Sequence, residues 1–122
     1  MSQTEYTIEE LLAQVRLETR AADKVHTFSR GMVQRLAVCR AVLHAPELLL
    51  LDEPRANLDP SGAALVEPLI GAASGATRVI SSHDPAGGLA EADLALGLRF
   101  GRVELLAPAA DVDAERIGAL YR

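Results

Sequence analysis

Four consecutive leucines, at positions 48–51, run directly into Asp52, Glu53 and Pro54. A short apolar run without alternation is typical of a strand that is covered on both faces of a parallel sheet, although a turn of buried helix has the same pattern. Two neighbouring acids at the end of such a strand cost solvation energy unless water or a cation meets them. The segment therefore predicts an α/β fold in which a buried strand delivers two carboxylates to one edge of a sheet.

The sequence on either side of this strand alternates between helix and strand patterns, which is the order of an α/β domain with parallel strands. Capping residues indicate where helices start, and short apolar runs indicate the strands. In the first part of the chain, we expect a helix from Thr7, a helix over 30–44 and the strand over 48–51. A helix that begins at Asp59 and Pro60 should follow, and Pro68 should kink or shorten it. We then expect a strand over 78–81, a brief helix, a hairpin around 99–101 and a charged C-terminal helix.

Composition narrows the classes of function. The 122 residues carry 17 acidic and 12 basic side chains, and the net charge of −5 argues against general nucleic-acid binding. A single cysteine, Cys39, excludes an internal disulfide. The polar start lacks the pattern of a secretory signal, and no apolar stretch reaches the roughly 18 residues of a membrane helix. We therefore expect any link to a membrane to come through a partner.

Polar residues follow both strands that we expect to be parallel. Asp52 and Glu53 end the first strand, and His83 follows the second. Because ligands meet open α/β sheets at the carboxyl ends of the strands, we expect these three side chains to share a site. An aspartate at the end of an apolar strand suits a Walker B element, which holds Mg²⁺ at nucleotide phosphates and leaves the glutamate to orient or deprotonate water. The simpler alternatives are an acidic turn after a buried strand and a lone surface histidine.

The stretch over residues 28–54 resembles the part of ABC-type ATPases that runs from the signature motif into Walker B. The segment Phe28–Met32, with the sequence FSRGM, stands in the place of the family's Leu-Ser-Gly-Gly-Gln. Gln34 and Arg35 follow as the family's downstream Gln-Arg does. The physical chemistry of Ser29 agrees with the resemblance, because the start of a helix favours an anion, although a plain N-cap serine is the alternative.

Two further landmarks of that family follow in the same order. The segment RANLDP, over 55–60, occupies the place of the D-loop and centres on Asp59, and SSHD puts His83 in the place of the switch histidine. The resemblance implies the C-terminal part of a P-loop NTPase domain of the ABC ATPase type, with a mainly parallel sheet flanked by helices and a C-terminal hairpin and helix. It divides the chain into a helical-subdomain and signature part over 1–45 and a part over 46–122 that carries the remaining landmarks.

The resemblance also implies ATP and Mg²⁺ as ligands and an ATP-binding, ATP-hydrolysing subunit of an ABC transporter. Asp52 is expected to bind the metal, and Glu53 and His83 are expected to be catalytic. The nucleotide contacts are expected from the signature segment and the D-loop, namely Ser29, Arg30, Gly31, Met32, Gln34 and Asp59.

The sequence departs from the family pattern within the signature segment and also at Arg55 and Asn57, which replace the usual small residues before the D-loop aspartate, and it lacks one motif. Arg30 replaces the first glycine of the signature and Met32 replaces its glutamine, so that Arg30 either adds charge to phosphate binding or blocks close approach. The SRGM form and the lower half of the chain resemble the haem-exporter branch of cytochrome c maturation. The 122 residues contain no G-x-x-x-x-G-K-[ST] segment. We therefore expect this chain alone to hold ATP too weakly to hydrolyse it.

The partners follow from the same resemblance, since ABC ATPases act as head-to-tail pairs. We expect a second ATPase subunit and a transmembrane transporter subunit, with the chain in the cytoplasm at the inner face of the cell membrane and no nucleic acid as ligand. Two alternatives stay open. The chain could be a non-catalytic regulatory remnant that pairs with a complete ATPase. It could also be an ABC-like ATPase of DNA repair or chromosome maintenance. This alternative ranks lower, because such proteins would place a long coiled coil upstream and residues 1–28 show none.

Overall fold

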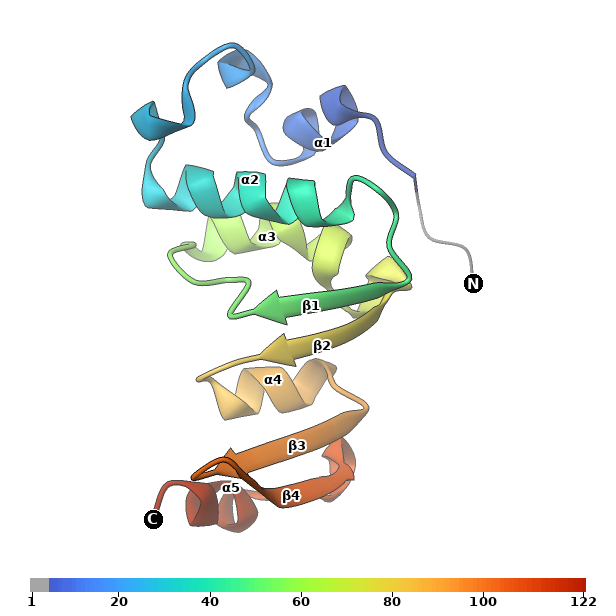
Figure 1. Ribbon diagram of the computed structural model, residues 1–122, viewed down its shortest axis with the longest axis vertical. Coiled ribbons are helices and arrows are strands. Elements are labelled where there is room, and N and C mark those ends of the chain that lie inside the picture. The colour runs from blue at the N-terminus through green and yellow to red at the C-terminus, as the bar shows by residue number, and fades with distance from the viewer. Residues whose placement is uncertain (1–4) are drawn as a thin grey trace. The chain divides into compact units, whose positions relative to one another are not determined.

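The computed structural model describes residues 5–122, so the first four residues of the expected 1–45 segment lie outside the described residues. The described residues form two compact units, 5–81 and 82–122. The described part of the first unit contains α1 (Ile8–Gln14), α2 (Arg30–Val42), β1 (Leu48–Asp52), α3 (Pro60–Ile70) and β2 (Thr77–Ser81), with short 3-10 helices at Glu18–Arg20, Val25–Thr27 and Ala72–Ser74 (Figure 1). The second unit contains α4 (Pro85–Glu91), β3 (Leu94–Arg99), β4 (Arg102–Pro108), a 3-10 turn at Ala109–Asp111 and α5 (Ala114–Leu120). The predicted α/β class with a C-terminal hairpin and helix is confirmed.

Helix α1 begins where the capping pattern predicts. The Thr7 hydroxyl accepts a hydrogen bond from the Glu10 amide at 3.0 Å, and the Glu10 carboxylate accepts one from the Thr7 amide at 3.1 Å. This reciprocal arrangement satisfies two backbone donors that the helix itself cannot pair. The predicted capping box is therefore present.

Helix α3 also begins and ends for local reasons. The Asp59 carboxylate accepts a hydrogen bond from the Gly62 amide at 2.8 Å, and Pro60 opens the helix where its missing N–H costs nothing. Pro68 lies in the last turn, and the helix ends at Ile70, two residues later. Shortening at Pro68 is what the sequence predicted, because proline lacks the N–H that continues the helical hydrogen bonds.

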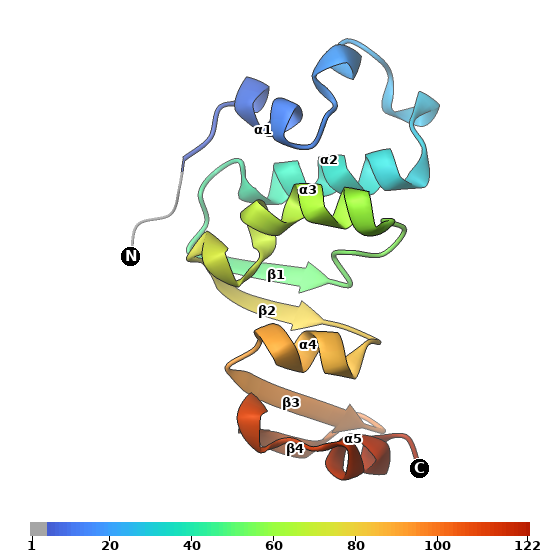
Figure 2. The ribbon, with the colours of Figure 1, turned by 180° about the vertical axis from the view of Figure 1, so that it is seen from behind.

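Strands β1 and β2 pair in parallel, with Leu48 opposite Thr77 and Asp52 opposite Ser81. Helices α2 and α3 lie side by side above this pair in both views (Figures 1 and 2). The core of the first unit forms between these helices, α1 and the inner face of the strands; it consists of Leu11, Val15, Leu17, Val38, Cys39, Val42, Leu49, Leu51, Val66, Leu69 and Ile70. The core therefore fixes the direction of β1 and, with it, the place of the acids at its end.

Strand β1 is covered on one face only, and the expectation that both faces are buried is wrong. Leu49 and Leu51 are 4% and 8% exposed, whereas Leu48 and Leu50 are 51% and 73% exposed. Because successive side chains of a strand point to opposite faces, α2 and α3 can cover only alternate leucines. The four-leucine run follows from strand formation and one-sided packing, and its outward leucines form an apolar surface together with Val79 of β2, which is 59% exposed.

The second unit is built on a two-residue hairpin. Phe100 and Gly101 link β3 to β4 with φ values of 50° and 73°, as a tight turn with two left-handed residues requires. The predicted hairpin is confirmed. Helix α5 packs against β3 at Gly97, where a Cβ atom would lie 2.8 Å from the Leu120 side chain. Glycine at this position therefore permits the close approach of the helix to the strand.

Among the described residues, none of the helices has both the length and the apolar character needed to cross a bilayer.

Candidate functional site

The two acids that end β1 are organised by Ser81, the last residue of the neighbouring strand. The Ser81 hydroxyl donates a hydrogen bond to the Asp52 carboxylate and accepts one from the Glu53 amide at 3.0 Å. The Glu53 amide also lies 3.2 Å from the Ser81 carbonyl oxygen. Parallel pairing thus places a hydroxyl between the two acidic residues. Sequence reasoning missed Ser81, and the available signal was its place at the end of the second parallel strand.

The loop after β1 has an unusual backbone at the second acid. Glu53 has φ of 45° and Asn57 has φ of 63°, a left-handed conformation that non-glycine residues rarely adopt. The Ala56 amide donates to the Glu53 carbonyl at 3.1 Å, and the Leu58 amide donates to the Arg55 carbonyl at 3.3 Å, so that the loop folds back as successive turns. Backbone strain of this kind concentrates at functional sites and persists only where the surroundings hold it.

The predicted signature segment forms the start of α2. The Ser29 hydroxyl accepts a hydrogen bond from the Met32 amide at 3.2 Å. Ser29 is therefore an N-cap, which was the alternative to a role in anion binding. Ser29 and Arg30 are exposed, whereas Met32 is half-buried and packs against the core. The first amides of a helix have no partner within the helix and favour an anion. A role in phosphate binding therefore stays a prediction that suits Ser29 and Arg30 better than the Met32 side chain.

The first turns of α2 lie directly against the loop that follows β1. A Cβ atom on Gly31 would lie 3.2 Å from the Asn57 carbonyl oxygen, so a larger residue would push on the loop backbone. The Gln34 side-chain amide donates a hydrogen bond to the Pro54 carbonyl at 2.6 Å. The structure thus brings the signature-like and D-loop-like segments of the first unit together. The sequence assigned Gln34 to nucleotide contact and gave no sign of its bond to this loop.

Asp59 acts as the N-cap of α3, which was the simpler alternative to a functional role. Hydrogen bonds from the Gly62 amide and then from the Ser61 hydroxyl hold the pKa of the Asp59 carboxyl below its ordinary value. The carboxylate is exposed and stays charged at neutral pH, so its predicted contact with nucleotide or a second subunit is compatible with its capping role.

The described residues contain no cluster of three or more His, Cys, Asp or Glu side chains that could enclose a metal ion. Mg²⁺ does not require one, because it keeps several waters and commonly uses one or two carboxylates together with substrate phosphates. Asp52 is exposed at the edge of the strand pair, with the Ser81 hydroxyl beside it. These groups fit a Mg²⁺ ion that is shared with phosphate and do not form a site for a metal on its own.

His83 belongs to the second unit, where it is exposed in the segment that leads into α4. Next to it the Asp84 amide donates to the Ser82 hydroxyl at 3.0 Å, which shapes the turn before Pro85. The approach of His83 to the acids at the end of β1 stays a prediction.

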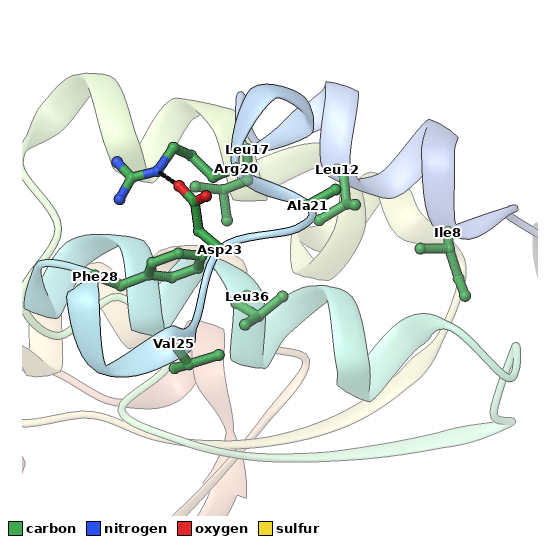
Figure 3. A pocket seen from close by; sticks show the side chains of 9 residues that line it. All are labelled: Ile8, Leu12, Leu17, Arg20, Ala21, Asp23, Val25, Phe28 and Leu36. Carbon is green, nitrogen blue, oxygen red and sulfur yellow. Dashed lines mark hydrogen bonds and ion pairs between the residues drawn. The ribbon is translucent and has the colours of Figure 1, made fainter.

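A small cavity of about 180 Å³ lies elsewhere in the first unit (Figure 3). It is bordered by α1, by α2 and by the segment between them, which contains the 3-10 helices Glu18–Arg20 and Val25–Thr27. Arg20 and Asp23 form an ion pair beside it, and the guanidinium of Arg20 lies 5.3 Å from the centre of the Phe28 ring. The cavity is lined by Ile8, Leu12, Leu17, Arg20, Ala21, Asp23, Val25, Phe28 and Leu36. It is mostly apolar, smaller than ordinary ligand pockets of about 300 Å³ or more, and contains none of the predicted site residues.

Comparisons with known proteins relate the chain to ATP-binding proteins of ABC transporters. The family model described as ABC transporter matches residues 2–56. The phosphonates import ATP-binding protein PhnC of Frankia casuarinae is 39% identical over 117 residues, which cover 93% of this chain and 46% of that protein. The lipoprotein-releasing system ATP-binding protein LolD of a Ruegeria species is 47% identical over 78 residues, covering 62% of this chain and 34% of that protein.

A solved structure of the ATP binding subunit of an ABC transporter superposes with a TM-score of 0.76 at 30% identity, covering 92% of this chain and 47% of that one. Over most of its length the chain is therefore similar to the ATPase, or nucleotide-binding, domains of ABC transporters. It spans about half the length of the PhnC relative and of the solved subunit.

Proposed function

We propose that the chain is the part of a transport-coupled ABC ATPase domain that supplies the Walker B, D-loop and signature residues for ATP hydrolysis. The observation that carries the proposal is the pairing of β1 with β2, which sets Asp52 and Glu53 at one edge of the strands with the Ser81 hydroxyl between them. The packing of the following loop on the start of α2 supports it, because a helix start, which favours an anion, then lies next to that loop in the same unit.

Each residue has a role that its surroundings allow. Asp52 would hold Mg²⁺, which when bound supplies positive charge to the phosphates. Glu53 would orient the attacking water and take its proton, and His83 would orient the same water from the second unit. At the start of α2, Ser29, Arg30 and Gly31 would face the phosphates of nucleotide held by a second ATPase subunit.

The partners belong to the same proposal. The chain spans about half of the relatives that it matches, so we propose that a P-loop-bearing segment completes the nucleotide site. A second ATPase subunit and a transmembrane subunit would complete the transporter, with this chain on the cytoplasmic side of the membrane. The names of the relatives give different cargoes, phosphonates and lipoproteins. The assignment to haem export stays a prediction from the SRGM segment and the lower half of the chain.

A second candidate function is that of a regulatory chain that pairs with a complete ATPase without hydrolysing ATP. The departures at Arg30 and Met32 favour it, because Arg30 adds a bulky side chain at a position where glycine allows close approach to phosphate, and the Met32 side chain packs into the core. The retained pair of Asp52 and Glu53 favours the catalytic proposal.

The test compares this chain alone with a chimera in which the preceding segment of the Frankia PhnC relative is joined in front of it. The chain alone should show no Mg²⁺-dependent ATP hydrolysis, whereas the chimera should hydrolyse ATP. Glu53→Gln should slow the chimera by about 10²- to 10⁴-fold, as expected for loss of a general base. Glu9→Gln, an exposed acid in the first turn of α1, is the control and should leave the rate unchanged.

Each other result changes the conclusion. Turnover by the chain alone that Glu53→Gln abolishes would show that no added P-loop is needed. A chimera that hydrolyses ATP equally well with Glu53→Gln would exclude the general-base role. A folded chimera that binds ATP without hydrolysing it would favour the regulatory candidate.

A further inference from the structure

We infer that Gln34 is a positioning residue, whose side-chain amide fixes the loop that carries Glu53 to the first turns of α2. The distance of 2.6 Å from the Gln34 amide nitrogen to the Pro54 carbonyl oxygen is short for an N–H···O hydrogen bond. Gln34 is half-buried and Pro54 is buried, so water competes little for either group. A hydrogen bond in such surroundings holds its partners more firmly than one on the surface.

The hydrogen bond from Gln34 lies next to the residue of the loop whose backbone is strained. Pro54 directly follows Glu53, whose left-handed backbone is disfavoured by itself and needs support from its neighbours. On the strand side, the support comes from Ser81, which bonds the Glu53 amide. On the side of α2, the Gln34 amide bonds the next carbonyl along the chain. The loop is thus held at two successive residues, from two different elements.

Two further contacts join the loop to helices α2 and α3. The Arg55 guanidinium donates to the Glu67 carboxylate of α3 at 3.0 Å. The Asn57 carbonyl oxygen lies close to Gly31, in the turn of α2 that precedes Gln34. The ion pair between Arg55 and Glu67 is partly exposed and therefore weak, so the half-buried hydrogen bond from Gln34 is the stronger of these two interactions.

The inference replaces nucleotide contact with a mechanical role for Gln34. The side-chain nitrogen of Gln34 is directed at the Pro54 carbonyl of the loop. The residue keeps the start of α2 and the loop of Glu53 in one relative position. The relevance of that position to hydrolysis rests on the proposed function, whereas the tie itself does not.

The experiment measures amide hydrogen exchange by NMR in the full chain without nucleotide. The reporters are the amides of Ala56 and Leu58, which bond carbonyls within the loop. Gln34→Met and Gln34→Glu keep the length of the side chain but lose the donor at neutral pH, and both should speed exchange at the reporters by about three- to tenfold, as expected for loss of one hydrogen bond. Gln34→Lys keeps an N–H donor on a long side chain and should stay within about twofold of the wild type.

Gln14 provides a matched control, because its side-chain amide also donates to a backbone carbonyl, that of Leu65, at 2.9 Å, and is also half-buried. Gln14→Met should leave the exchange of Ala56 and Leu58 unchanged.

Three outcomes would overturn the inference. Unchanged exchange with Gln34→Met would show that the bond does not hold the loop. Equal acceleration with Gln34→Lys and Gln34→Met would show that packing matters and not the donor. Loss of protection throughout β1 and β2 with Gln34→Met and Gln34→Glu would assign the bond to folding of the unit. The exchange experiment uses no nucleotide, so its results test the role of Gln34 even if the proposed ATPase activity is absent.

Discussion

Two neighbouring leucines of β1 should respond very differently to the same substitution. Leu51 is 8% exposed on the face covered by α2 and α3, whereas Leu50 is 73% exposed on the other face. Leu51→Ala removes three buried carbon atoms, which is worth about 2.4 kcal/mol of transfer free energy, and the cavity left behind raises the expected loss to about 2.5–4 kcal/mol. Leu50 has only about a quarter of its surface buried, so Leu50→Ala should cost about 0.6 kcal/mol.

The assay is equilibrium unfolding in urea followed by circular dichroism, with the free energy of unfolding compared between the two variants. Both substitutions place alanine in the same strand, so the lower strand propensity of alanine affects both equally and cancels in the difference. A loss of more than about 2 kcal/mol with Leu50→Ala, similar to that with Leu51→Ala, would refute one-sided burial of β1.

Three further outcomes follow from the described contacts. Burial raises the pKa of the Cys39 thiol to about 11, so at pH 8 the native chain should react with iodoacetamide about 100-fold more slowly than the urea-unfolded chain, and equal rates would contradict its burial. The pKa of Asp59 is lowered by its hydrogen bonds, so its stabilising effect is present above the pKa of the unfolded carboxyl and is lost as the pH falls through the lower folded pKa. An NMR titration midpoint at or above the ordinary carboxyl pKa of 3.8 would contradict this. Thr7→Ala removes the capping box of α1 and should lower the free energy of unfolding by about 1 kcal/mol in the urea assay, and no loss would show that the box contributes nothing.

The features that the sequence predicts best are those decided by neighbouring residues. Thr7, Ser29 and Asp59 each cap the helix that follows, because a side-chain oxygen three residues before an amide can satisfy that amide whatever the rest of the fold does. The hairpin turn at Phe100 and Gly101 is likewise a local preference. Such elements could be placed within one or two residues.

The contacts that shape the candidate site join segments that are far apart in the chain, so local sequence patterns do not predict them. The bond of Gln34 to Pro54 spans 20 residues, and that of Ser81 to Asp52 spans 29. Both follow from the register of parallel strands and the packing of α2, which no single pattern specifies. One-sided burial of β1 was missed for the same reason, since four leucines in a row do not reveal how many faces have neighbours.

Paramagnetic relaxation by Mn²⁺ measures most directly whether Asp52 and His83 share one nucleotide site. The sample is the chimera with the PhnC segment, with Mn²⁺ and ATP added, and the His83 ring signals are assigned by comparison with His83→Gln. We predict strong broadening of the His83 signals that is lost with Asp52→Asn, and much weaker broadening at His44, which precedes the opposite end of β1. Unbroadened His83 signals while ATP is bound, or broadening that persists with Asp52→Asn, would contradict a shared site.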